Sequence, residues 1–265
     1  MTTHYENLAT LDAWTEFFKV TPAELPERQM RGRRMSGFIR GIAQPQPPVE
    51  PVDPCGDAPA ASVAPVATAA PAGVAPAPKK TAPRVIREWV PAQWGFVPGV
   101  AKSASDARLR AIKLLEARNE TVSTAQAFRE AWLAGQRCIV PMQAFYEDDW
   151  RSGKKAVPTR IARVDGQPMG AAGVWADWKD PETGEVITSY ALLTINANSH
   201  ALMRRYGHDG AERRMLAILG EGTYDAWLTA RQDKAREFMR AYPSNWLLAN
   251  PVEDKKDKKP KGWLD

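Results

Sequence analysis

The second half of the chain contains a series of short, strand-like apolar runs with few helical segments between them. The runs occupy residues 138–140, 144–146, 159–163, 169–175, 190–196 and 215–219. Strands this short and this closely spaced favour a mostly antiparallel, barrel-like sheet. Asp165 and Gly166 separate two of the runs, and this dipeptide is typical of a hairpin turn. We therefore expect residues 159–163 and 169–175 to pair with each other.

Helical patterns are fewer. Apolar residues recur at helical spacing between Leu8 and Phe18, which predicts an amphipathic helix facing the core. Ser123 opens a capping-box pattern and Gly135 supplies a C-terminal stop, so a second short helix is expected between them. Residues 101–115 are charged and mixed, and they fit either a short helix or a loop.

The length of 265 residues is enough for one well-buried domain, or at most two. Residues 45–83 are dominated by Pro and Ala and show no periodic pattern. Such a segment cannot bury enough apolar area to offset its ordering entropy. We expect a disordered or polyproline-like insertion in a surface loop rather than a boundary between domains.

Charge and cysteine content narrow the class of protein. The net charge of +5 is compatible with a polyanionic partner without requiring one. Cys55 and Cys138 do not suggest a disulfide framework, and a reducing compartment fits them. The three histidines and two cysteines show no zinc-site spacing, so we expect neither a metal nor another cofactor. No signal-peptide pattern and no apolar run of about 18 residues occurs, and we expect a soluble, intracellular protein.

Glu147 is the first candidate for chemistry. The apolar run 138–140 stops at Pro141, and a second apolar patch then leads directly to this acid. Apolar walls from Tyr146 and Trp150 would raise the pKa of the carboxyl, as in a general acid or base. The alternative is a glutamate at the end of a strand that faces water.

Four sequence blocks extend this observation. They are Trp94-Gly95-Phe96-Val97-Pro98, then Glu116-Ala117-Arg118-Asn119-Glu120-Thr121, then Arg137-Cys138-Ile139-Val140-Pro141 with Phe145-Tyr146-Glu147, and last Leu193-Thr194-Ile195-Asn196-Ala197-Asn198 followed by His208 and Arg214-Met215. Taken together and in this order, the blocks resemble those of the SOS response-associated peptidase (SRAP) family, the abasic-site processing proteins.

The resemblance implies an α+β fold: a single SRAP-type domain with a mostly antiparallel, barrel-like sheet and flanking helices. The domain would span residues 1–250, interrupted by the Pro/Ala-rich insertion at 45–83. Residues 251–265 would form a basic C-terminal tail, which adds non-specific attraction to nucleic acid.

The resemblance also implies three catalytic positions: Thr2, Glu147 and His208. In the family the initiator Met is removed, and the residue that becomes first is a Cys in the active site, where this chain has Thr2. The family's histidine lies just ahead of the Arg-Met pair, which favours His208, with His200 as the rival candidate.

A further set of residues is expected to contact DNA. The resemblance points to His4, Arg34, Trp94, Glu116, Arg118, Asn119 and Arg214. Glu116 replaces a family Asn and would place an anion near a phosphodiester. The arginines between Arg28 and Arg40 either line a phosphate-binding groove or form a solvated face.

Three functions compete at this stage. The first is processing of abasic sites in single-stranded DNA, in which the Thr2 amine forms an imine and the chain acts as a lyase. The second is the peptidase activity of the family name, with Thr2 as an N-terminal nucleophile. The third is a catalytically impaired single-stranded DNA-binding protein. Thr2 in place of Cys makes a stable crosslink doubtful in each case. We expect a monomer that contacts no membrane and acts in the cytoplasm, associated with the nucleoid.

Overall fold

A computed structural model describes residues 2, 4–43, 85–151, 155–207 and 210–252. The α-helices are α1 Leu11–Ala13, α2 Ala104–Lys113, α3 Arg129–Leu133, α4 Tyr224–Leu228 and α5 Gln232–Ala235. A π-helical segment, Trp14–Phe18, continues α1, and 3₁₀ turns cover Met203–Arg205, Glu221–Thr223, Arg236–Phe238 and Ser244–Trp246. The expected insertion at 45–83, with Cys55, and most of the expected tail lie outside the described residues.

One of the two sheets is closed into a barrel. Its strands are β3 Met35–Ala43, β4 Val85–Trp94, β6 Arg137–Met142, β9 Met169–Lys179 and β10 Val186–Asn196. They pair around the ring in the order β10, β4, β3, β6, β9 and back to β10. Only the β10–β4 pairing in this ring is parallel. The predicted α+β class and the mostly antiparallel, barrel-like sheet are therefore confirmed.

Three short strands extend the barrel. β5 Glu116–Arg118 pairs in parallel with β10, β11 Arg214–Leu216 pairs with the end of β10, and β12 Ile218–Leu219 pairs with β9. β5 and β11 both contact β10 near Thr194, which pairs with Arg118 on one side and with Leu216 on the other. Two of the sequence blocks that lie far apart in the chain are thus joined through one strand.

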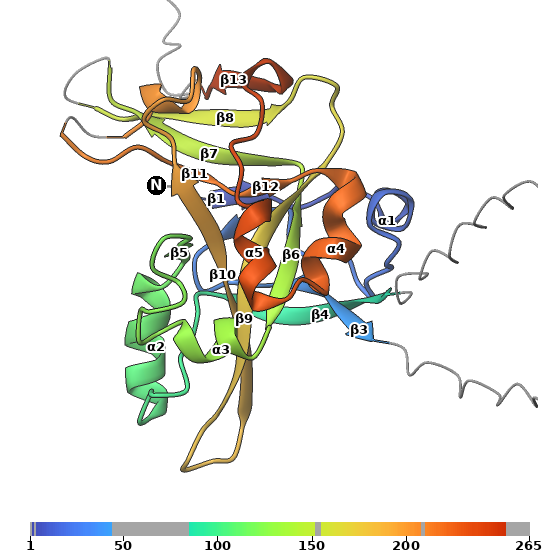
Figure 1. Cartoon of the computed structure of the whole chain (residues 1–265), viewed down its shortest axis with the longest axis vertical. Coiled ribbons are helices and arrows are strands. Elements are labelled where there is room, and N and C mark those ends of the chain that lie inside the picture. Colours follow the sequence, from blue (N-terminus) through green and yellow to red (C-terminus); the bar gives the residue numbers. More distant parts are fainter. Residues whose placement is uncertain (1, 3, 44–84, 152–154, 208–209, 253–265) are drawn as a thin grey trace, which may run out of the picture.

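The second sheet has five antiparallel strands and lies across one end of the barrel (Figure 1). Its order is β13 Leu247–Pro251, β8 Val157–Arg163, β7 Ala144–Asp149, β1 His4–Glu6 and β2 Gln29–Arg31. The chain passes from β6 of the barrel to β7 of this sheet through Gln143 alone. Glu147 is therefore carried on a strand fixed at both sides, by β1 and by β8.

A close approach of backbones at Gly173 allows the barrel to close. Gly173 on β9 pairs with Cys138 of β6 and with Leu192 of β10. A Cβ at this position would lie 2.7 Å from the sulfur of Cys138 and 3.0 Å from the carbonyl oxygen of Ala191. Any larger residue would push these strands apart, so the position requires glycine.

The predicted hairpin between residues 159–163 and 169–175 is wrong. Gly166 does adopt the left-handed turn conformation, with φ 74°. However, β8 pairs with β7 and β13, whereas β9 pairs with β6, β10 and β12. The turn therefore transfers the chain from one sheet to the other. The hairpin of this region is β9–β10, which reverses around residues 180–185.

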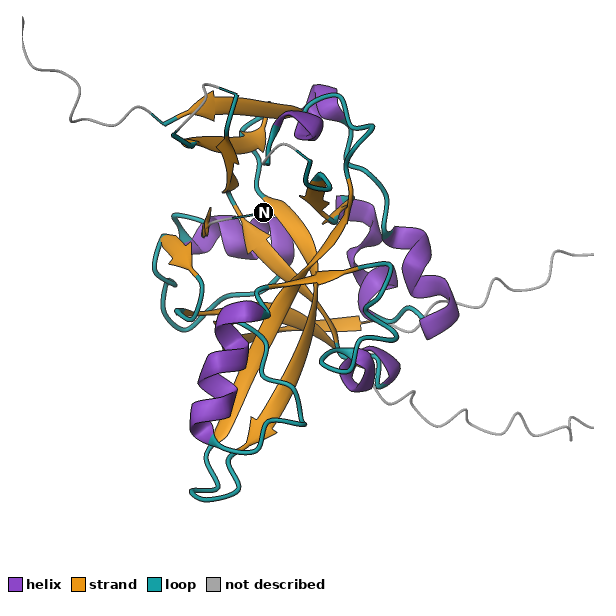
Figure 2. Cartoon of the chain, turned by 90° about the vertical axis from the view of Figure 1, so that its left-hand side faces the viewer, coloured by secondary structure: helices purple, strands orange, loops and turns teal. Residues whose placement is uncertain are grey.

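The helical predictions hold in part, and the helices lie outside the sheets (Figure 2). Trp14 and Phe18 are buried as expected, but the helix begins only at Leu11. Residues 104–113 form α2, which settles the open choice between helix and loop. The capping box at Ser123 is not used, since turns precede α3, although Gly135 ends it at φ 74°. Among the described helices none is long and apolar enough to cross a membrane.

A buried hydrogen bond fixes the N-terminal strand onto the barrel. The hydroxyls of Tyr5 on β1 and Tyr190 on β10 lie 2.5 Å apart, and both side chains are fully buried. Because β1 begins only two residues after Thr2, this contact also places the N-terminal threonine.

Candidate active site at the N-terminal threonine

Thr2 is buried where the two sheets meet, and two carboxyl groups from distant parts of the chain contact it. Its hydroxyl donates to Oε1 of Glu147 over 2.8 Å, and its backbone nitrogen donates to Oε1 of Glu116 over 2.9 Å. Two of the positions suggested by sequence, Thr2 and Glu147, are therefore brought into direct contact. Glu116, which is expected to contact DNA, accepts the bond from the nitrogen of Thr2.

Glu147 has an environment suited to acid–base chemistry. Its side chain is buried, and desolvation together with the nearby charge of Glu116 raises the pKa of its carboxyl to about 7. A group with that pKa is about half protonated at neutral pH, so it can both donate and accept a proton. The alternative, a glutamate facing water, does not describe this residue.

Glu116 is placed by the parallel pairing of β5 with β10, in which it lies opposite Leu192. Burial raises the pKa of its carboxyl, whereas its bond from Thr2 and the charge of Arg214 act in the opposite direction. The two acids thus approach Thr2 from different sheets, Glu147 on the hydroxyl and Glu116 on the nitrogen.

A cavity of about 380 Å³ opens beside Glu116. Three cationic side chains line it, and its described lining is Lys113, Glu116, Arg118, Thr194, Gly207, Ala211, Glu212 and Arg214. Arg118 and Arg214, two of the residues expected to bind DNA, therefore lie on the wall of a cavity that reaches the Thr2 cluster.

Ion pairs connect the cations of this wall. Glu212 accepts hydrogen bonds from Arg118 over 2.8 Å and from Arg214 over 2.9 Å, and Asn196 donates to the same carboxylate. Arg214 also contacts Glu120 over 2.9 Å and the carbonyl oxygen of Thr194 over 2.7 Å. Sequence reasoning missed Glu212, although it stands two residues before Arg214 and would share its face in an extended chain.

A second missed group supports the strand that carries Glu147. Glu6 on β1 accepts hydrogen bonds from Arg160 on β8 and from the hydroxyl of Tyr146 on β7. The ring of His4 stacks on Tyr146 at a centroid distance of 3.8 Å. Burial and the charge of Arg31 lower the pKa of His4. These contacts join β1, β7 and β8 directly behind the Thr2 cluster.

Three residues expected to contact DNA, Trp94, Asn119 and Arg34, do not line the cavity beside Glu116. Trp94 is fully buried and donates to the carbonyl oxygen of Leu115, so its ring belongs to the core. Asn119 has a buried Oδ1 without a hydrogen-bond partner. Arg34 is exposed and paired with Glu27.

The arginines between Arg28 and Arg40 do not form one loop, because β2, a turn and β3 divide them. Arg40, for example, pairs with Glu88 over 2.7 Å and lies over the ring of Trp175.

The two histidine candidates differ. His208 lies outside the described residues. His200 is buried, its Nδ1 accepts from the backbone nitrogen of Met203, and its Nε2 contacts the carbonyl oxygen of Tyr242. Both ring nitrogens of His200 are therefore bonded to the backbone, as in a residue that fixes a turn.

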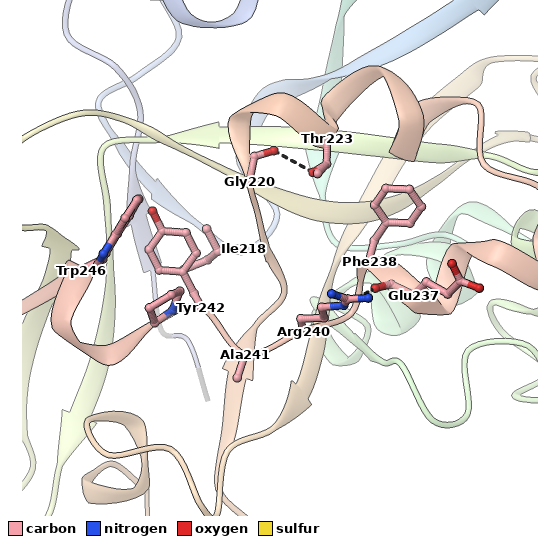
Figure 3. Close-up of a pocket in the computed structure, with 10 residues that line it drawn as sticks. Ile218, Gly220, Thr223, Glu237, Phe238, Arg240, Ala241, Tyr242 and Trp246 are labelled. Carbon is pink, nitrogen blue, oxygen red and sulfur yellow. Dashed lines mark hydrogen bonds between the residues drawn. The ribbon is translucent and has the colours of Figure 1, made fainter. Parts of the chain in front are cut away.

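A second cavity, of about 460 Å³, lies between β12, the 3₁₀ turn Arg236–Phe238 and the segment before β13 (Figure 3). It is lined mostly by apolar and aromatic side chains, among them Phe238, Tyr242 and Trp246, and it shares no lining residue with the cavity beside Glu116. The described residues contain no group of three His, Cys, Asp or Glu side chains that could hold a metal ion.

Comparison with known protein families identifies the family to which this chain belongs. The family model described as SOS response associated peptidase (SRAP) matches residues 49–258, which is most of the chain. This chain belongs to the SRAP family. A solved structure from Bordetella bronchiseptica superimposes with a TM-score of 0.72 and 34% identity, and the match covers 95% of this chain and 99% of that one.

Curated relatives in the SRAP family are named abasic site processing proteins. YoqW of Bacillus subtilis is 29% identical over 163 residues, which is 60% of this chain and 67% of the relative. HMCES of Gallus gallus is 25% identical over 179 residues, 60% of this chain and 51% of the relative. The chain thus spans about two thirds of the first relative and about half of the second.

Proposed function

We propose that this SRAP protein binds single-stranded DNA and reacts with the aldehyde of an abasic site through the nitrogen of Thr2. The observation that carries the proposal is the pair of hydrogen bonds that hold the nitrogen and the hydroxyl of Thr2 on two carboxyl groups beside a cation-lined cavity. The names of the relatives, abasic site processing proteins, support the same substrate class.

The reaction requires that Met1 is removed, so that the nitrogen of Thr2 becomes an α-amine. An α-amine has an ordinary pKa of about 7.7–8.0, lower than the value of about 10.4 for lysine, and it is partly unprotonated at neutral pH. The amine adds to the aldehyde carbon of the ring-opened sugar to give a carbinolamine. Loss of the hydroxyl as water, with one proton supplied, then gives the protonated imine.

Glu147 is the group that supplies this proton in the proposal. A carboxyl with a pKa of about 7 carries its proton in about half of the molecules at neutral pH. It accepts a hydrogen bond from the hydroxyl of Thr2, the same residue whose nitrogen reacts. Proton donation by Glu147 converts the departing hydroxyl into water.

The cations on the cavity wall supply the affinity. Arg118, Arg214 and Lys113 line one cavity, and arginine binds phosphate oxygens with two parallel hydrogen bonds. The flanking phosphates of the abasic nucleotide would exchange with Glu212 on the two arginines. This contact orients the strand without reading its sequence.

Thr2 determines the fate of the adduct. A thiol at this position would close on the imine carbon to give a five-membered ring with sulfur, whereas the hydroxyl of Thr2 would give its oxygen counterpart, which opens more readily. The imine of this chain should therefore hydrolyse, or lose the 3′ phosphate by β-elimination as in a lyase.

Borohydride trapping tests the proposal. The chain without Met1, checked by intact mass, is incubated with an abasic oligonucleotide, and we expect a covalent adduct only when borohydride is present. Acetylation of the Thr2 amine should abolish the adduct, and Thr2→Cys should give an adduct that survives denaturing electrophoresis without reductant. If the free Thr2 amine forms no trapped adduct while DNA still binds, the chain is a catalytically impaired DNA-binding protein and the proposal is wrong.

A further inference from the structure

The two acids beside Thr2 contact different atoms, and this division separates their roles. Glu147 accepts the proton of the hydroxyl, and Glu116 accepts the proton of the nitrogen. The nitrogen is the atom that becomes positively charged when Met1 is absent. A carboxylate 2.9 Å from that atom is therefore placed as its counter-ion.

We propose that Glu116 sets the charge state of the Thr2 nitrogen, holding the α-amine as ammonium through neutral pH and pairing with the protonated imine that follows. The inference rests on the proposed reaction of Thr2 and adds a residue to it. An opposite charge within about 4–6 Å favours the charged form and shifts a pKa by about 1–3 units. For the amine the shift is upward.

The surroundings of Glu116 favour its ionised form when an ammonium is present. Lys113, Arg118 and Arg214 line the same cavity, and the charge of Arg214 lowers the pKa of the Glu116 carboxyl against the effect of burial. Two further acids face this region, Glu147 from β7 and Glu212 from the segment before β11. Glu212 is already paired with two arginines, and Glu147 is partly protonated at neutral pH.

Burial makes the counter-ion necessary. Thr2 is 4% exposed, so a cation at its nitrogen has little contact with water. A buried charge without a partner is strongly disfavoured, and removing one member of a buried pair leaves the other uncompensated. With Glu116 absent, the nitrogen should lose its proton at lower pH, and the imine should be harder to protonate.

The consequence for the reaction is an alkaline shift. Only the unprotonated amine attacks the aldehyde, and Glu116 keeps the amine protonated to a higher pH than the ordinary value of about 7.7–8.0. In return, the same carboxylate keeps the imine protonated, which is the form that water and borohydride attack. Glu116 therefore slows the attack of the amine on the aldehyde at neutral pH, and it makes the resulting imine more reactive by keeping it protonated.

The decisive experiment measures the pKa of the Thr2 amine without DNA. The chain lacking Met1 is acylated briefly with acetic anhydride at a series of pH values, and modification of the N-terminal peptide is followed by mass spectrometry. We expect the midpoint of Glu116→Gln to lie about 1–3 pH units below that of the parent chain. Glu116→Asp, which keeps the charge, should restore a midpoint close to the parent value.

Glu212→Gln is the matched control, because it removes a carboxylate from the same cavity that does not contact Thr2. The pH midpoint of Thr2 acylation in this variant should equal that of the parent chain. Equal midpoints in the parent chain and Glu116→Gln would overturn the inference, as would an equal downward shift in Glu212→Gln.

Borohydride trapping on samples of the same proteins that have not been acylated separates the two proposals. If an adduct is trapped but the acylation midpoint is the same in the parent chain and in Glu116→Gln, the proposed reaction of Thr2 is supported. The role of Glu116 as counter-ion is then wrong. Shifted midpoints without any trapped adduct would support the counter-ion and contradict the proposed function.

Discussion

Two groups of residues near Thr2 carry carboxyl groups in opposite surroundings. We call Glu116 and Glu147, which bond Thr2, the floor of the site. We call the charged residues on the wall of the neighbouring cavity, Arg118, Glu212 and Arg214, its rim. On the floor, burial raises the pKa values of Glu116 and Glu147. On the rim, hydrogen bonds from Asn196 and Arg214 lower the pKa of Glu212. Glu147, with a pKa of about 7, can therefore exchange a proton near neutral pH, whereas the acid of the rim stays ionised.

This difference shows how one cavity can separate chemistry from binding. Proton transfer needs a group whose two protonation states are close in free energy, and burial provides that. Phosphate binding needs cations that can exchange one anion for another, and arginines paired with acids on the cavity wall provide that. Each prediction below changes one side of the cavity and leaves the other intact.

The largest effect is expected on the floor. Glu147→Gln keeps the size of the side chain and its ability to accept from the hydroxyl of Thr2, but it removes the exchangeable proton. We expect imine formation, followed by borohydride trapping, to slow by roughly 10²–10⁴-fold. DNA affinity should change little, because the cations of the rim are untouched. Trapping at the parental rate would show that Glu147 is not the site acid.

The next effect concerns stability and pH. The pKa of Glu147 is about 7 in the folded chain against an ordinary value of 4.5, so the unfolded chain loses this proton first as the pH rises. Glu147 therefore lowers the free energy of unfolding between about pH 4.5 and pH 7, by about 3 kcal/mol in all, and adds no further loss above that window.

Glu147→Gln removes this dependence. Relative to the parent chain, the variant should gain about 3 kcal/mol between pH 4.5 and pH 8, measured by urea denaturation at each pH. Glu116 remains in both proteins, so its own contribution cancels to first order in the comparison. A stability difference that does not vary with pH would mean that Glu147 is ionised throughout and that the floor resembles the rim.

The smallest effect is expected on the rim. Glu212→Gln removes a competing anion from Arg118 and Arg214, and ion pairs in contact with solvent contribute only modestly to the free energy. Affinity for single-stranded DNA at low salt should rise about two- to fivefold, measured by fluorescence anisotropy. The acylation midpoint of Thr2 should not move.

Glu237→Gln is the control for net charge, since Glu237 pairs with Lys234 at an exposed site that does not line this cavity. An equal gain in affinity in this variant would show that total charge, and not release of the two arginines, is responsible.

The sequence by itself determined the local parts of this protein. The apolar runs at 138–140 and 144–146 predicted strands, and β6 and β7 are found there. The runs left open whether Glu147 faces apolar walls or water, and its burial decides for the first. The block pattern also identified the SRAP family and, through it, the mixed α+β fold with a barrel-like sheet.

Only the tertiary structure decided which of these parts meet. Glu116 and Glu147 lie 114 and 145 residues from Thr2, and no local pattern states that both would bond to it. The hairpin predicted at Asp165 failed for the same reason: a turn signal fixes the reversal of the chain, but strand partners are chosen by the sheets that each strand completes. Likewise Trp94, conspicuous in sequence, became part of the core, because the barrel closes over it.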